Sequence, residues 1–113
     1  CVTNKPRSCT GVLLEHSGLA GFFEVVVAGD DLVETKPAPG PLLYAADQLQ
    51  VGPQDCVVIG DSHNDVDAAR AAGMAVLVVT WGYHQGLEWS AMGATQLVSQ
   101  FNQIFHVVAP AVR

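Results

Sequence analysis

One segment of the sequence, GDSHNDVDAARAAG, places two carboxylates where a divalent cation could bind. Asp61 directly follows the apolar run CVVIG, and Asp65 lies four residues later, in the first turn of an expected helix. Two carboxylates at such a turn can hold a hard cation such as Mg²⁺, with waters and substrate oxygens completing the shell. Ser62 and Asp65 also fit a helix capping box. The spacing therefore predicts Asp61 as a metal ligand and Asp65 as either a second ligand or an anchor of the loop.

Two further segments carry groups that can neutralise or cradle a phosphoryl group. In VTNKP, the hydroxyl of Thr3 and the backbone N–H groups from Asn4 onward could surround a phosphoryl oxygen, although a Thr-Asn pair after a strand is also ordinary turn chemistry. In TKPAPGPLL, Pro37 favours an extended backbone at Lys36, so the lysine would project from a stiff base. A lysine held in this way can stabilise a carboxylate nucleophile and a transferring phosphate.

The elements that must position these residues alternate between apolar runs and helical patterns. The runs FFEVVVAG, CVVIG and MAVLVV predict buried strands, and ATQLV predicts a short edge strand. Helices are expected at GVLLEHSG, PLLYAADQL and NDVDAARAAG, with a weak one after Ser99. This order predicts an α/β fold: a Rossmann-like parallel sheet with helices on both faces. In such folds ligands bind beyond the carboxyl ends of the strands, and the candidate residues all fall there.

Composition limits the classes of partner. The chain has 113 residues and a formal net charge of -6, which argues against nucleic acid and against an anionic membrane surface. Half of the residues are hydrophobic and only 14% are charged, a low charged fraction for a small domain. Either further segments cover part of this chain, or it is an unusually apolar complete domain. Three cysteines without CxxC spacing fit a reducing cytoplasm.

The order of these motifs resembles the haloacid-dehalogenase superfamily. A threonine after a first strand, a lysine before a helix and GDxxxD after a later strand follow the order of the last three motifs of that superfamily. Within it, VTNKP, KPAPGPLL, GDSHNDVDAARAAG and TWGYHQG look most similar to bacterial phosphoglycolate phosphatases, and together they cover nearly the whole chain. Trp81 and His84 depart mildly from the tyrosine and asparagine expected in the last of these segments.

The resemblance implies a Mg²⁺-dependent phosphate monoesterase that forms an aspartyl-phosphate and acts on a small phosphorylated metabolite such as 2-phosphoglycolate. Thr3 and Asn4 would bind the phosphoryl group, and Lys36 would stabilise the charge of nucleophile and phosphate. Asp61 would ligate Mg²⁺ with support from Asp65. The loop Gly82–Gly86 would lie near the mouth of the site, or act only as a turn.

The same resemblance exposes a large departure. No segment resembles the family motif DxDGT, which carries the nucleophile and the general acid/base, and no helical cap precedes VTNKP. We therefore expect residues 1–113 to be the C-terminal part of an incomplete core domain, inactive alone. The family's first strand lies at the centre of its sheet, so its absence would leave two half-sheets with unpaired edges that favour self-association.

Other functions remain open at this point. A sugar-phosphate phosphatase or phosphomutase has the same core, whereas the paired aspartates disfavour a dehalogenase, which needs no metal. A domain that binds Mg²⁺ or phosphate without chemistry is the alternative from a different class. Receiver domains place their acidic residues before the threonine, and dinucleotide binders need a GxGxxG that no helix here begins with.

Overall fold

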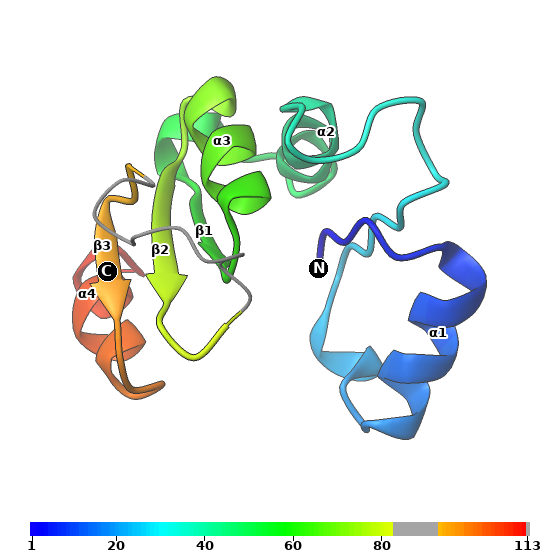
Figure 1. The fold of residues 1–113 in the computed structure, drawn as a ribbon, viewed down its shortest axis with the longest axis horizontal. Coiled ribbons are helices and arrows are strands. Elements are labelled where there is room, and N and C mark those ends of the chain that lie inside the picture. The colour runs from blue at the N-terminus through cyan, green and yellow to red at the C-terminus, as the bar shows by residue number, and fades with distance from the viewer. Residues whose placement is uncertain (83–92, 113) are drawn as a thin grey trace.

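The computed structural model describes residues 1–82 and 93–112, with side chains described as far as residue 108. Its elements are α1 (Arg7–His16), the 3₁₀ turn η1 (Ala20–Phe22), α2 (Gly40–Gln48), the 3₁₀ turn η2 (Pro53–Asp55), β1 (Val57–Gly60), α3 (His63–Ala72), β2 (Ala75–Val79), β3 (Gln96–Val98) and α4 (Gln103–Val112). The strands form a parallel sheet in the order β1-β2-β3 (Figure 1). The predicted α/β class is confirmed.

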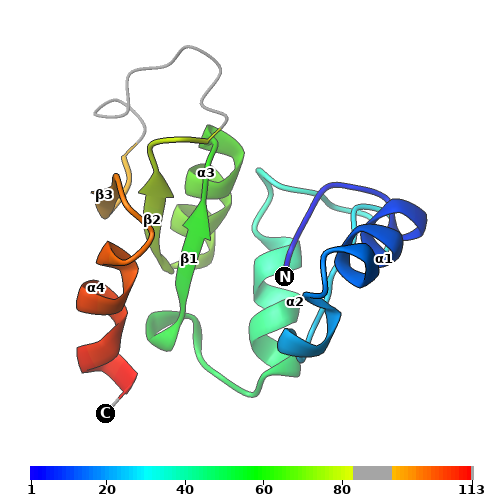
Figure 2. The same cartoon turned by 90° about the horizontal axis from the view of Figure 1, so that it is seen from below.

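The two faces of the sheet are covered by different helices (Figure 2). Val76 and Val78 of β2 pack with α2 and α3 in one buried cluster. Leu77 and Val79 face the other way, where Val98 and the apolar side of α4 cover them. Alternate residues of a strand point to opposite faces, so the continuous apolar run of β2 is buried on both. Helices therefore cover β2 on both faces, whereas β3 contributes Val98 to the α4 side only.

Edge strand β1 is less well covered. It pairs with β2, and its residues Val57 and Ile59 are 39% and 48% exposed on the face that α4 covers farther along the sheet. Beside β1 lies an apolar groove of about 350 Å³, bordered across the gap by Cys1, Val2 and Phe23. Such an unpaired apolar strand edge can readily pair with another chain.

The strand predicted for FFEVVVAG is wrong in extent. In the structure this segment contributes one isolated parallel bridge, between Val2 and Val27, and the 3₁₀ turn η1 occupies its start. Val27 donates to the carbonyl of Cys1 at 2.8 Å and accepts from Thr3 at 3.0 Å. A strand needs a partner along its length. Here the partner is the short segment around Val2 at the start of the chain, and Phe22 is 81% exposed.

The helices agree well with the sequence pattern. The stripe predicted for α2 is buried at Leu42, Ala45 and Ala46, and Pro41 lies in its first turn, where the missing N–H costs nothing. Helix α3 ends at Gly73, whose φ of 76° places it in the left-handed region that favours glycine. Helix α3 packs on β1 and β2, and α2 packs on α3, which fixes the positions of the loops that begin both helices.

Candidate functional site

The candidate site lies where three segments that are far apart in the sequence meet. The loop after β1 carries Asp61, the residues after the Val2 bridge are Thr3 and Asn4, and Lys36 precedes α2. Lys36 reaches both of the other segments: its Nζ donates to the carbonyl of Val2 at 2.8 Å and to Oδ1 of Asp65 at 2.6 Å. Lys36 thus joins the N-terminal turn to the first turn of α3, and the predicted convergence of Thr3, Lys36 and Asp61 on a phosphate stays a prediction.

The pair formed by Lys36 and Asp65 is largely withdrawn from solvent. Their side chains are 12% and 9% exposed, respectively. Burial by itself would raise the pKa of the Asp65 carboxyl, but the hydrogen bond and positive charge of Lys36 outweigh that effect, helped by backbone N–H donors. The pKa of Asp65 is therefore lowered, which favours the charged carboxylate beside Lys36.

The second oxygen of Asp65 fastens the loop that carries Asp61. Oδ2 accepts from the backbone N–H of Asp61 at 3.0 Å, from that of Ser62 at 3.3 Å and from the Ser62 hydroxyl at 3.4 Å. With the bond from the N–H of Asp65 to the Ser62 side chain, this is the predicted capping box. Both oxygens of Asp65 are thus engaged by hydrogen-bond donors, and this geometry favours the anchoring role over direct metal ligation.

Asp61 stands at the carboxyl end of β1, as the sequence predicted. Gly82, which follows β2, packs directly against it: a Cβ at Gly82 would lie 2.0 Å from the Cβ of Asp61. Only glycine allows this approach of the two chain segments. The remainder of the predicted loop, Tyr83–Gly86 with His84, lies outside the described residues, so its place near the site stays a prediction.

Thr3 and Asn4 are held in the first turn after the Val2 bridge. The hydroxyl of Thr3 accepts from the backbone N–H of Lys5 at 3.1 Å. The side chain of Asn4 binds the backbone of Lys36 at both its polar ends, at 3.0 and 2.8 Å. The predicted role of both residues at a phosphoryl group stays a prediction; the Asn4 side chain already has two partners.

A cluster around Arg7 keeps this turn in place. Its guanidinium binds the carboxylate of Asp31 and the carbonyl of Val26, and its backbone N–H donates to Asp30 at 2.7 Å. The bond to Arg7, together with one from the N–H of Ala28, lowers the pKa of Asp31 to about 2. Through Arg7, the pair Asp30-Asp31 thus connects the start of α1 to the segment around Val26 and Val27. The sequence around this pair does not resemble a catalytic motif.

Mg²⁺ is a hard cation that binds oxygen ligands. Among the residues described, no group of three or more His, Cys, Asp or Glu side chains could hold a metal. Mg²⁺ is usually bound by only one or two carboxylates together with waters and substrate oxygens. Asp61, at the strand end and beside the fixed Asp65, meets that minimum, so the chain fits a Mg²⁺ ion held by one of its own carboxylates.

Sequence reasoning missed His63 and the close approach at Gly29. Nδ1 of His63 is buried without a hydrogen-bond partner among the described residues, next to the loop of Asp61. A Cβ at Gly29 would lie 1.9 Å from the carbonyl oxygen of Asn4. A histidine inside GDSHND is visible in the sequence, but its burial follows only from the packing of the loop, so no pattern could have revealed it.

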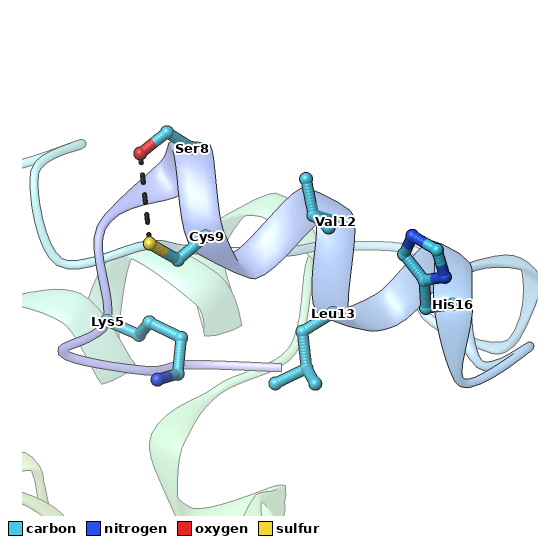
Figure 3. Close-up of a pocket in the computed structure, with 6 residues that line it drawn as sticks. All are labelled: Lys5, Ser8, Cys9, Val12, Leu13 and His16. Carbon is cyan, nitrogen blue, oxygen red and sulfur yellow. Dashed lines mark hydrogen bonds between the residues drawn. The ribbon is translucent and has the colours of Figure 1, made fainter.

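A second hollow lies on α1, away from the ion pair. It measures about 470 Å³ and is lined by Lys5, Ser8, Cys9, Val12, Leu13 and His16 (Figure 3). Val12 and Leu13 are more than half exposed there. The residues follow helical spacing along one side of α1, so this hollow is an uncovered helix face, and none of the predicted site residues lines it.

The fold and the site together define an α/β protein with a charged site beside the carboxyl end of a parallel strand. Residues 1–73 match the family model of haloacid dehalogenase-like hydrolases, and the chain belongs to this family. It is 43% identical over 111 residues to the plasmid phosphoglycolate phosphatase of Cupriavidus necator, covering 98% of this chain and 48% of that protein. The chain thus spans about half the length of this relative.

Solved structures give the same family. A protein described as a predicted phosphoglycolate phosphatase from Haemophilus somnus superposes with a TM-score of 0.90 at 31% identity, over 95% of this chain and 48% of the other. A protein assigned as a beta-phosphoglucomutase from Thermotoga maritima gives 0.83 at 30% identity, over 96% and 50%. The predicted family resemblance is confirmed. Separately, no helix within the described part of the chain is long and apolar enough to cross a membrane.

Proposed function

We propose that this chain supplies the phosphate- and metal-binding half of a Mg²⁺-dependent phosphate monoesterase of the phosphoglycolate phosphatase type. The observation that carries the proposal is the partly buried ammonium of Lys36, held between Val2 and Asp65 at the edge where Thr3 and the Asp61 loop also end. A fixed cation of this kind stabilises the charge that develops on a transferring phosphoryl group. The relatives named as phosphoglycolate phosphatases support a small phosphorylated substrate.

Each residue has a distinct part in this proposal. Lys36 neutralises the attacked phosphate and the carboxylate that takes up the phosphoryl group, and Thr3 donates its hydroxyl to a phosphoryl oxygen. Asp65 holds the side chain of Lys36 by a direct ion pair and holds the Asp61 loop in place. Asp61 is the residue that would hold Mg²⁺, which when bound would add positive charge at the phosphate. The carboxylate that forms the aspartyl-phosphate is not among these residues, because the 113 residues contain no DxDGT motif.

A phosphomutase is the second candidate, favoured by the likeness to the protein assigned as a beta-phosphoglucomutase. Both reactions use the same phosphoryl site and differ in whether water or a sugar hydroxyl accepts the phosphoryl group. A domain that binds phosphate and Mg²⁺ without turnover would retain the Lys36 arrangement as well. Substrate assays of a complete protein separate the three.

A chimera tests the proposal. We expect residues 1–113, substituted for the segment they match in the Cupriavidus necator enzyme, to restore Mg²⁺-dependent release of phosphate from 2-phosphoglycolate, whereas the chain alone gives no turnover. Lys36→Met in the chimera should lower kcat by about 10²–10³-fold, the cost of losing one preorganised charge-stabilising group. Asp67→Ala, a change at an exposed position of α3, is the matched control. A folded chimera without phosphatase activity contradicts the proposal, and conversion of β-glucose 1-phosphate would favour the mutase.

We also propose that the free chain self-associates through the exposed edge of β1. Sedimentation velocity at increasing concentration should show a dimer or larger species. Ile59→Lys should shift the distribution towards monomer, because an edge charge blocks strand pairing. Val33→Lys is the control, since Val33 is fully exposed and far from the strands in sequence. A chain that stays monomeric, or an equal response to both variants, argues against this edge as the interface.

A further inference from the structure

The side chain of Asn4 holds Lys36 by its backbone. Oδ1 of Asn4 accepts from the N–H of Lys36 at 3.0 Å, and Nδ2 donates to the carbonyl of Lys36 at 2.8 Å. Each residue has one backbone donor and one acceptor, and this single amide satisfies both at Lys36. Two bonds to one residue fix its orientation as well as its position.

The other end of Lys36 is held by the same N-terminal segment. Its Nζ donates to the carbonyl of Val2 and to Asp65, while Asn4 holds the main chain. A lysine side chain has a flexible four-carbon stem, so fixing one end alone leaves the charge mobile. Holding both ends selects one placement of the ammonium group. Residues 2–4 and Asp65 together therefore determine where the positive charge lies.

We propose that Asn4 is a positioning residue that acts through Lys36. Both polar groups of its side chain bind the Lys36 backbone, and in this proposal Asn4 serves a phosphate by placing the lysine. The importance of this placement for phosphate rests on the function proposed above, whereas the clamp on Lys36 does not. The sequence had suggested the same residue as a direct phosphate ligand.

The lysine content of the chain makes a direct test practicable. Lys5 and Lys36 are the only lysines in the sequence. Lys5 is exposed and serves as an internal reference, whereas the Lys36 side chain is only 12% exposed and is held in its ion pair. We would label the chain with trace acetic anhydride and measure acetylation at each lysine by mass spectrometry. In the unchanged chain Lys36 should react more slowly than Lys5.

Asn4→Ala should raise the ratio of Lys36 to Lys5 acetylation by about tenfold, the effect of losing roughly one to two hydrogen bonds. Asn102→Ala, at an exposed asparagine remote in sequence, should leave the ratio unchanged. Asn4→Asp keeps the acceptor and loses the donor, so it should give an intermediate ratio. It also covers the case in which the alanine variant fails to fold, as judged by circular dichroism. An unchanged ratio in every folded Asn4 variant overturns the proposal.

A titration with inorganic phosphate and Mg²⁺, followed by ³¹P NMR, separates this inference from the proposed function. Weaker phosphate binding in Asn4→Ala with an unchanged acetylation ratio would mean that Asn4 touches phosphate directly, and would overturn the clamp. A raised ratio supports the clamp whether or not phosphate binds. Absence of phosphate binding in the unchanged chain, with a raised ratio in the variant, counts against the proposed function alone.

Discussion

Replacing Asp65 with alanine is expected to lower the free energy of unfolding by about 3–5 kcal/mol, the cost of leaving a buried charge without its partner. The change removes the acceptor of the Lys36 ammonium and of the N–H groups of Asp61 and Ser62. It also removes the capping box that begins α3. Urea denaturation followed by circular dichroism measures the loss.

Two comparisons make the result specific. Asp67→Ala changes another aspartate of α3 that is exposed, and should alter stability by no more than about 0.5 kcal/mol. Lys36→Met should cost less than Asp65→Ala, because the remaining carboxylate keeps its bonds to the Asp61 and Ser62 N–H groups. A double-mutant cycle should then give a coupling of about 0.5–3 kcal/mol. If Asp65→Ala and Asp67→Ala have equal effects, the pair contributes nothing to the fold.

The pH dependence has a defined sign. The pKa of Asp65 is lowered in the folded chain, so the unfolded state binds a proton at higher pH than the folded state does. The stabilisation from this residue is therefore complete above about pH 4 and is lost as the pH falls through the lowered value. The difference in stability between the unchanged chain and Asp65→Asn should shrink over that acidic range.

Gly29→Ala should be the most disruptive of the small substitutions near the site. A Cβ at position 29 would lie 1.9 Å from the carbonyl oxygen of Asn4 and 2.5 Å from its carbonyl carbon. Both are backbone atoms, so no side-chain rotation can relieve the overlap, and the two segments must separate. We expect a loss of about 2–3 kcal/mol, at the upper end of the range for overpacking.

Gly11→Ala is the matched control for this change. Gly11 lies within α1, and a Cβ there would meet nothing within 4 Å. Alanine in a helix interior should stabilise the chain by about 0.5–1 kcal/mol. The two substitutions are thus predicted to have opposite signs in the same unfolding experiment. A Gly29→Ala chain as stable as the unchanged one would mean that residues 4 and 29 are not in contact.

The sequence predicted most of the fold because its helices and inner strands carry strong local patterns. The run of β2 is buried on both faces, and the stripe of α2 is buried where its spacing indicated. FFEVVVAG has an equally strong pattern, yet it pairs only at Val27. Local propensity records what a segment favours, whereas a strand forms only where another strand lies beside it, and that is a property of the whole sheet.

The sequence predicted which motifs contribute to the site, but it did not predict the hydrogen bonds between them. The capping box of Ser62 and Asp65 and the position of Asp61 follow from spacing along one turn. The clamp of Asn4 on Lys36 joins residues 32 apart in the chain. No periodicity connects such residues, so only the folded arrangement shows that one asparagine binds a distant backbone.

The two oxygens of Asp65 limit which residues can replace it. One oxygen accepts from the backbone N–H of Asp61 at the start of α3, and the other accepts from the ammonium of Lys36. Both bonds depend on a side chain with a single methylene. Glutamate would carry the charge outward, and asparagine would put an amide N–H₂ in place of one oxygen. Loss of turnover after substitution of Asp65 would therefore not demonstrate metal binding, because a disrupted start of α3 would also abolish turnover.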